Sequence, residues 1–263
     1  MSCTIVTAYF KSPSKYNTAS YDEWMSNFLT TVDNEMVIFC DRGSFEFITN
    51  LRANFANKTR VVIIELEQLY CSQPQFMEYW KKDIARDCER NIHNINLYII
   101  WNEKAMFVGK VMKADPFKTE FFMWCDIGCF RYKEEVHLFK KEFPSKKFLK
   151  SAKKDKMYFL NICPFEKEDF KILPNGLTGE FKYLNRIGGT MFIGHKDIFE
   201  KYVEMYYNCM IAYMNQDYFA GKDQSIMATM CVLYPEIFHL VTPVDGEGNP
   251  WFYLQRFLLL EVV

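Results

Sequence analysis

Asp126 is the one acidic residue in the apolar segment FFMWCDIGCFR, which runs from Phe121 to Arg131. A buried carboxylate is costly unless a hydrogen-bond donor or a cation meets it. One interpretation is that a strand delivers this oxygen ligand to Mg²⁺ or Mn²⁺ beside a phosphate group, with Gly128 letting the backbone approach the ligand. The other is an aspartate that bonds local amides in a turn. The triplet Asp-Ile-Gly by itself favours the turn.

A second acid, Asp223, stands where a helix is predicted to begin. Aspartate is a good N-cap, and such a cap contributes about 1 kcal/mol to a helix. In the functional interpretation, Asp223 and Gln224 hold sugar hydroxyls, or Asp223 is the general base to an acceptor hydroxyl. Lys104 lies on the predicted helix that leads to the Asp126 strand, and it could reach phosphates as a point charge.

Three further positions have both a structural and a functional interpretation. Asp41 ends a predicted strand before Arg-Gly-Ser, so it either contacts a nucleoside or forms a turn. The pair Gly188-Gly189 allows close backbone approach to a ligand or another strand, but neither GxGxxG nor GxxxxGK spacing is present. His239 is flanked by apolar residues, which favours a core histidine over a nitrogen ligand near Asp126. The absence of HxxxH and HxH argues against a zinc hydrolase.

Four apolar segments are predicted as the strands that position these groups: residues 3–10, 35–40, 61–65 and 120–125. Helical patterns separate them, including a long helical region from about residue 77 to 117, and further helices start near 196 and 223. Shorter strands are predicted within 156–165, 190–193 and 235–244. This order indicates an α/β fold with a central, mostly parallel mixed sheet flanked by helices. Ligands of such sheets bind beyond the carboxyl ends of the strands, near Ala8, Tyr9, Asp41 and Asp126.

The composition argues against several classes of protein. The 263 residues carry 32 basic and 33 acidic side chains, and without a basic excess a general nucleic-acid binder is not expected. The nine cysteines form no CxxC pair, which predicts free thiols in a reducing compartment. Neither a signal peptide nor a membrane-spanning run is predicted, so we expect a cytoplasmic protein. No linker or repeat divides the chain, and one domain is expected.

Taken in order, the segments of the chain resemble the HtrL/YibB-like family of bacterial and viral proteins, and more broadly a GT-A type glycosyltransferase. The resemblance spans nearly the whole chain and rests on TIVTAYF (4–10), YDEWMSNFL (21–29), VIFCD (37–41), WNEK (101–104), FFMWCDIGCFR (121–131), GGTMFIG (188–194) and GKDQSIM (221–227). It implies a single GT-A-like, Rossmann-like domain. Residues 1–130 would bind the nucleotide, and residues 131–263 the donor sugar and the acceptor.

The resemblance implies an enzyme that transfers a sugar from a nucleotide-sugar donor, for example a UDP-sugar, to a hydroxyl of a glycan or protein. Mn²⁺ or Mg²⁺ would bind the diphosphate at Asp126, with His239 as a second candidate ligand, and would neutralise the departing nucleoside diphosphate. Asp223 would be the catalytic residue. The implied nucleotide and donor site comprises Ala8, Tyr9, Asp41, Lys104, Gly128, Gly188, Gly189 and Gln224.

One departure from the family pattern bears on the metal. The usual Asp-x-Asp of these enzymes is here Asp126-Ile127-Gly128. Either the single carboxylate binds metal together with the diphosphate and another group, or metal dependence is weakened. Two rival functions stay open: a catalytically inactive binding protein with this fold, and a nucleotidyltransferase that makes an activated sugar. The latter usually has a glycine-rich basic loop after the first strand, whereas this loop carries Lys11 and Lys15 but no glycine.

Overall fold

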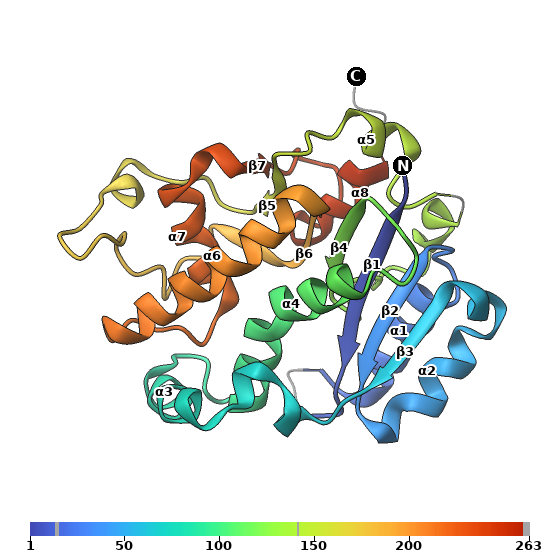
Figure 1. Ribbon diagram of the computed structural model, residues 1–263, viewed down its shortest axis with the longest axis horizontal. Coiled ribbons are helices and arrows are strands. Elements are labelled where there is room, and N and C mark those ends of the chain that lie inside the picture. The colour runs from blue at the N-terminus through green and yellow to red at the C-terminus, as the bar shows by residue number, and fades with distance from the viewer. Residues whose placement is uncertain (14–15, 141, 260–263) are drawn as a thin grey trace.

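Seven strands form one mostly parallel sheet in the computed structural model (Figure 1). The structure describes residues 1–13, 16–140 and 142–259, and Lys15 lies outside them. The sheet order is β3-β2-β1-β4-β6-β5-β7. Only β6 runs antiparallel to its neighbours, and the other pairs are parallel. The predicted mixed sheet is therefore confirmed. The strands are β1 (Cys3–Tyr9), β2 (Glu35–Cys40), β3 (Thr59–Ile63), β4 (Phe121–Cys125), β5 (Met157–Asn161), β6 (Ile187–His195) and β7 (Phe238–Val241).

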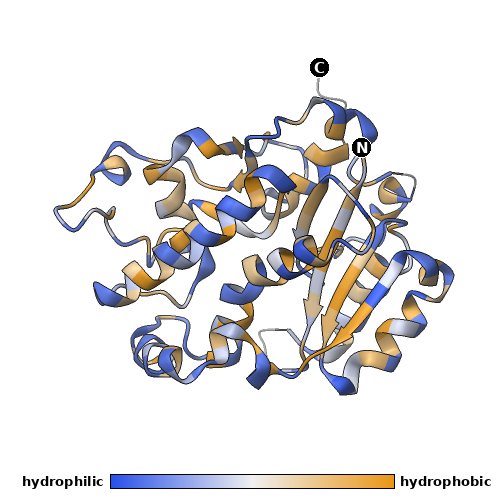
Figure 2. Ribbon diagram, viewed as in Figure 1, coloured by the Kyte–Doolittle hydropathy of each residue, from blue (hydrophilic) through white to orange (hydrophobic). Residues whose placement is uncertain are grey.

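Helices cover both faces of the sheet, and each face has its own hydrophobic core. One core contains side chains of α3 (Pro74–Arg86), α4 (Ile95–Ala114), α6 (Lys196–Asn215) and α7 (Asp223–Leu233). The other contains side chains of α1 (Thr18–Leu29), α2 (Phe45–Leu51), α5 (Lys146–Ser151) and α8 (Tyr253–Leu259). Figure 2 shows that the strands between these layers are largely hydrophobic. No helix in the described part of the chain is long and apolar enough to span a membrane.

The β4 strand is apolar at every position because it is buried on both sides. Phe122 and Trp124 belong to the core under α4 and α6, whereas Phe121, Met123 and Cys125 belong to the opposite core. Successive side chains of a strand point to opposite faces, so a strand covered by two helix layers reads as a continuous apolar run. The segment that ends in Asp126 is thus a central strand, as predicted.

The helical region predicted from residue 77 to 117 is two helices. The first, α3, ends at Arg86, and α4 begins only at Ile95. Local side-chain bonds separate the two: Asp87 accepts a hydrogen bond of 2.8 Å from the Glu89 amide, and Asn94 caps α4 by accepting from the Leu97 amide at 3.1 Å. Such bonds to the backbone compete with helix formation. Near Pro116 the helix ends as predicted.

The carboxyl ends of β1, β2 and β4 meet at one edge of the sheet. Residue pairing across the strands sets Ala8 level with Phe39, and Val6 level with Trp124. Asp126 therefore lies at the same edge as Asp41, with β1 between them. This confirms the predicted architecture, in which the two aspartates belong to one end of the sheet rather than to opposite ends.

The nine cysteines form no disulfide, which agrees with the prediction of free thiols. Only Cys88 and Cys163 are exposed. Burial raises the pKa of several of the others, among them Cys125. These buried cysteines act as small apolar side chains of the two cores rather than as nucleophiles.

Candidate functional site

A cavity of about 140 Å³ opens at the carboxyl edge of β1 and β4. Five of the residues predicted for the site line it: Ala8, Tyr9, Lys104, Asp126 and Gly128. The cavity therefore lies where ligands of parallel α/β sheets are expected to bind. The other predicted residues lie outside its wall: Asp41, Gly188, Gly189, Asp223, Gln224 and His239.

The ammonium of Lys104 joins three elements of the structure at the wall of this cavity. Its Nζ lies 3.1 Å from Oδ1 of Asp126, just after β4, and 2.9 Å from Oδ2 of Asp223, at the start of α7. It also donates a hydrogen bond of 2.8 Å to the carbonyl oxygen of Gly189 in β6. The contacts with the two carboxylates are ion pairs, and the contact with Gly189 is a hydrogen bond. The cation that meets the end of the buried β4 strand is thus a lysine of the chain itself.

Burial and charge act in opposite directions on this cluster. Burial lowers the pKa of Lys104, but the carboxylates of Asp126 and Asp223 outweigh it and raise that pKa above its ordinary value. Burial raises the pKa of Asp223, and the Lys104 ammonium opposes that rise. An opposite charge nearby favours the charged form of each group. Lys104 is therefore a cation throughout the physiological pH range.

Asn102 holds the chain before α7 against α4. It is fully buried, its Nδ2 donates to the carbonyl oxygen of Ala220 at 3.1 Å, and its Oδ1 accepts from the Tyr206 hydroxyl at 2.7 Å. Asn102 is two residues before Lys104 in the WNEK segment, and Ala220 is three residues before Asp223. This contact therefore ties α4, which carries Lys104, to the chain that leads to Asp223.

The glycine pair in β6 has two separate roles. A Cβ at Gly189 would lie 2.9 Å from Oδ2 and 3.0 Å from Oδ1 of Asp223, so a side chain there would displace the carboxylate. A Cβ at Gly188 would lie 2.9 Å from Cδ2 of Leu160 instead. Gly189 thus leaves room for the ion pair, whereas Gly188 allows close packing of β6 on β5.

Asp223 begins α7 without capping it. Lys222 holds the N-cap position, and no side chain makes a cap hydrogen bond there. Oδ1 of Asp223 accepts from the Gln224 amide at 2.9 Å, and its Oδ2 faces Lys104. The Gln224 side chain donates to the carbonyl oxygen of Ile187 at 2.7 Å. The N-cap interpretation of Asp223 is therefore wrong, because the carboxylate is used by a cation from another helix.

Asp41 forms the turn that was one of its two interpretations. Its Oδ1 accepts from the Ser44 amide at 2.8 Å and caps the short 3-10 helix Arg42–Ser44. Its Oδ2 accepts from the amide of Lys11 at 2.7 Å, and Lys11 lines the cavity. Asp41 therefore supports one wall of the cavity from the neighbouring strand, and a nucleoside contact by this residue stays a prediction.

The structure does not bring His239 to Asp126. His239 is exposed in β7 at the sheet edge, and β5 and β6 lie between β7 and β4. Three strand spacings correspond to about 14 Å. The His239 ring packs against Tyr158, with 4.8 Å between the ring centroids. Both earlier interpretations therefore need correction: His239 is neither a core histidine nor within reach of a metal bound by Asp126.

Arg131 is a cavity residue that the sequence interpretation did not single out. Its Nε donates to the carbonyl oxygen of Gly128 at 3.1 Å, and its Nη1 donates to the Tyr16 hydroxyl at 3.0 Å. The guanidinium carbon lies 4.3 Å from the ring centroid of Trp24 and 5.0 Å from that of Phe252. Aromatic faces attract a cation and hold it in place. An arginine five residues after the strand-end acid, in an otherwise apolar segment, was the signal that could have identified it.

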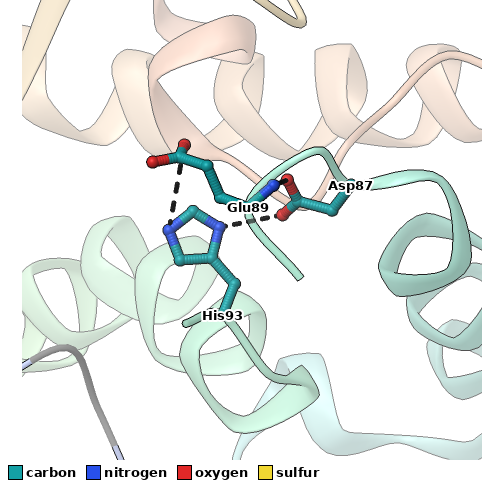
Figure 3. Close-up of side chains that lie close together, drawn as sticks. All are labelled: Asp87, Glu89 and His93. Atoms are coloured by element: carbon teal, nitrogen blue, oxygen red, sulfur yellow. Dashed lines mark hydrogen bonds and ion pairs between the residues drawn. The ribbon is translucent and has the colours of Figure 1, made fainter. Parts of the chain in front are cut away.

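A second group of ligand-type side chains lies between α3 and α4, and Figure 3 shows its members, Asp87, Glu89 and His93. Their ligand atoms all lie within 4.8 Å of one another, so the group could hold a metal ion. However, Oδ2 of Asp87 accepts from the Tyr98 hydroxyl and lies 2.8 Å from Nδ1 of His93. Glu89 forms an ion pair with Lys222. These contacts satisfy the two carboxylates without an ion.

Asp126 offers few ligand atoms for the Mn²⁺ or Mg²⁺ that the resemblance implies. Its Oδ1 already accepts from Nε1 of Trp124 at 2.6 Å and contacts Lys104. Of the described residues that line the cavity, none besides Asp126 is a carboxylate and none is a histidine. Mg²⁺ in nucleotide sites uses one or two carboxylates plus substrate phosphates, but here the carboxylate is shared with an ammonium that would repel the ion. The residues present fit a divalent ion poorly.

The sheet and the cavity at its carboxyl edge define a GT-A-like fold. Mouse xyloside xylosyltransferase 1, in its apo form, is similar to this chain with a TM-score of 0.52 and 10% sequence identity, covering 96% of this chain and 94% of that chain. At this identity the likeness concerns the fold alone. A 4-diphosphocytidyl-2C-methyl-D-erythritol synthase from Anaerococcus prevotii DSM 20548 covers 98% of this chain and 96% of that chain at 10% identity, and its TM-score of 0.40 is too low to carry an argument.

The chain belongs to the HtrL_YibB family. The family model that matches residues 1–259 is described as "Bacterial protein of unknown function (HtrL_YibB)". No curated protein matches the sequence. The family match confirms the resemblance drawn from the ordered segments of the sequence, and it covers both the β4 strand end and the α7 helix start that meet at Lys104.

Proposed function

We propose that the protein is a glycosyltransferase that moves a sugar from a nucleoside diphosphate sugar to a hydroxyl of a glycan or protein acceptor. The observation that carries the proposal is the contact of the Lys104 ammonium with Asp126, Asp223 and the Gly189 carbonyl at the cavity wall. Four segments of the chain meet there, at the edge of the sheet where α/β folds bind their ligands. The GT-A-like fold supports the same assignment.

In this proposal residues 1–130 bind the nucleotide, and residues 131–263 bind the donor sugar and the acceptor. The nucleoside lies against Ala8 and Tyr9, which line the cavity, and the diphosphate lies near Gly128 and Arg131. The oxygen of the acceptor hydroxyl forms a bond to the anomeric carbon as the bond from that carbon to the phosphate oxygen breaks, and the hydroxyl proton passes to the departing diphosphate. Negative charge then develops on the departing diphosphate, and preorganised donors and cations stabilise such charge.

In this proposal Asp223, Gln224, Gly188 and Gly189 belong to the half of the site that binds the donor sugar. The side chain of Asp223 is only 6% exposed, and Oδ2 faces Lys104 rather than the cavity. We therefore assign Asp223 to positioning the ammonium, in preference to taking the acceptor proton directly. A general base must lie within hydrogen-bond reach of the proton it removes.

In this proposal a divalent ion would have one protein ligand, Asp126. Were Mn²⁺ or Mg²⁺ to join the diphosphate, Oδ2 of Asp126 would be the protein oxygen left to hold it, and the ion would neutralise phosphate charge. Asp126 remains the residue proposed to adjoin the diphosphate with or without such an ion.

The proposal is tested by incubating the purified chain with uridine, guanosine, cytidine, adenosine and thymidine diphosphate sugars and measuring release of nucleoside diphosphate. We expect one donor to be consumed, and Asp126→Ala to slow its consumption by about 100-fold, because Asp126 helps to hold Lys104 in place and a misplacement of about 1 Å in a site can have an effect of that size. Asp155→Ala, which removes an exposed carboxylate, is the matched control and should react like the wild type.

The same assay separates the rival functions. Binding of a nucleotide sugar that is never consumed, with any acceptor, would favour an inactive binding protein of this fold. Release of pyrophosphate from a nucleoside triphosphate and a sugar phosphate would favour a nucleotidyltransferase. If no nucleotide sugar is bound or consumed, the proposed function is wrong.

A further inference from the structure

We propose that this site holds the diphosphate of its donor with the protein's own cations, Arg131 making the contacts and Lys104 neutralising Asp126 and Asp223, so that binding requires no divalent metal. The inference rests on the proposed function and assigns the charge-bearing groups of the same site. A diphosphate carries two or more negative charges, and a site that accepts it must balance them.

The cavity is positively charged without an added ion. Of the described residues that line it, Lys11, Lys104 and Arg131 are basic, and Asp126 is acidic. Asp223 lies behind the wall and adds one more carboxylate to the cluster. Among the lining residues alone, three cations face one carboxylate, and this excess attracts an anion; Asp22 and Asp41, which act on Tyr9 of the same wall, reduce the excess. A metal in a nucleotide site is held by one or two carboxylates together with substrate phosphates, and of the described residues that line this cavity only Asp126 is a carboxylate.

Lys104 acts on the carboxylates rather than on the phosphates. Its Nζ lies 3.1 Å from Oδ1 of Asp126 and 2.9 Å from Oδ2 of Asp223, and it donates a hydrogen bond to the Gly189 carbonyl. Only 4% of Lys104 is exposed, so these contacts hold the ammonium at the cavity wall and leave little of it open to a ligand. Its positive charge cancels one carboxylate and is shared with the second, which reduces their repulsion of a diphosphate. A metal ion between the two carboxylates would reduce this repulsion in the same way, but the Lys104 ammonium already occupies that position.

Arg131 has the geometry of a phosphate contact. Two of its nitrogens, Nε and Nη1, bond Gly128 and Tyr16, while Nη2 takes part in neither bond. The rings of Trp24 and Phe252 hold the guanidinium plane, so little side-chain entropy is lost when a ligand binds. Guanidinium groups pair with phosphate through short, charge-assisted hydrogen bonds. Arg131 lines the same cavity as Gly128 and Asp126, where the diphosphate is proposed to lie.

The experiment is calorimetric titration of the wild-type chain with UDP, GDP, CDP, ADP and dTDP, first in EDTA and then in excess Mn²⁺. We expect at least one nucleotide to bind in EDTA, with a Kd that Mn²⁺ changes by less than about fivefold, the lower bound of real coupling between two ligands. If EDTA abolishes binding that Mn²⁺ restores, the inference is overturned and the proposed function stands. If no nucleotide binds in either condition, both are wrong.

Variants of Arg131 test the assignment of the contact. Arg131→Ala should weaken binding about 10- to 100-fold in EDTA, because charge-assisted hydrogen bonds are lost. Arg131→Lys keeps the positive charge but loses the planar guanidinium, so its affinity should lie between those of the wild type and Arg131→Ala. It also tests the assignment if the alanine variant does not fold. Lys133→Ala removes an exposed charge two residues away and should bind like the wild type. Unchanged affinity in both Arg131 variants would overturn the assignment.

Discussion

The Nζ atom of Lys104 lies 2.9 Å from Oδ2 of Asp223, although 119 positions separate the two residues in the sequence and they belong to different helices. Both side chains are almost completely buried. A buried ion pair contributes little net stability relative to apolar residues, but removing one partner leaves an uncompensated charge. Substituting either partner of the pair is therefore expected to reduce the stability of the protein and to disturb the site.

Replacing Lys104 by methionine should destabilise the protein by about 3–5 kcal/mol, the range measured when one partner of a buried pair is removed. The loss arises because Asp126 and Asp223 would then face each other without the ammonium. Chemical denaturation at pH 7 measures it. Lys113→Met, an exposed lysine on the same helix α4, should change stability little. A Lys104→Met variant as stable as that control would show that the ion pair is not formed in solution.

The Lys104→Met variant should also gain a response to Mn²⁺ that the wild type lacks. Without the ammonium, two carboxylates and the Gly189 carbonyl converge on one position, and hard divalent cations bind such oxygen groups. We expect Mn²⁺ to raise the melting temperature of the variant, measured by differential scanning fluorimetry. The double variant Lys104→Met/Asp223→Asn should lose that response. Equal Mn²⁺ shifts in all three proteins would contradict the idea that the lysine occupies a cation position.

A pair of glycine variants separates the site from the packing of the sheet. Gly189→Ala would place a Cβ 2.9 Å from Oδ2 of Asp223, whereas Gly188→Ala would meet the end of the Leu160 side chain. Both should be destabilised by about 1–3 kcal/mol, as overpacking typically costs. Only Gly189→Ala should also lose donor turnover, by about tenfold or more, because it moves the carboxylate that holds Lys104. Comparable turnover in the two variants would argue against a role for the ion pair in the reaction.

His195 predicts a pH dependence of stability. Burial lowers the pKa of its imidazole, so the unfolded chain takes up a proton at a higher pH than the folded protein does. The stability that His195 contributes is therefore present above about pH 6.5, its ordinary pKa, and is lost as pH falls through the lower folded pKa. His195→Asn should lose less stability than the wild type between pH 7.5 and 5, because asparagine does not titrate in this range. Asparagine is also a good N-cap, so the start of α6 should be kept. His137→Asn changes an exposed histidine and should retain the full wild-type pH dependence.

The fold was largely predictable because β1, β2 and β4 are apolar on both faces, a pattern that parallel central strands require. The break between α3 and α4 was not. No proline or glycine marks residues 87–94, and the break depends on bonds from the Asp87 and Asn94 side chains to nearby amides. The antiparallel direction of β6 could not be predicted either. It depends on how β6 pairs with β4 in the folded sheet, and the composition of a strand does not determine that pairing.

The residues of the site were predicted better than their contacts. Lys104, Asp126 and Asp223 were each identified from local sequence, but their convergence depends on the packing of α4 against the chain before α7, which no local pattern contains. His239 was named as a second candidate ligand beside Asp126, but the sheet order puts β7 at the far edge. Arg131 was missed because it follows the predicted strand end, and its aromatic neighbours come from distant segments.

The most direct test of the account is a crystal structure of the wild-type chain with the nucleoside diphosphate that it binds. The account predicts the nucleoside against Ala8 and Tyr9, the phosphate oxygens within hydrogen-bond distance of the Arg131 guanidinium, and Lys104 still between Asp126 and Asp223. A nucleotide bound elsewhere, for example beside Asp87, Glu89 and His93, would contradict the proposed site. A nucleotide in the cavity with a metal ion in the position of the Lys104 ammonium would contradict the assignment of that lysine.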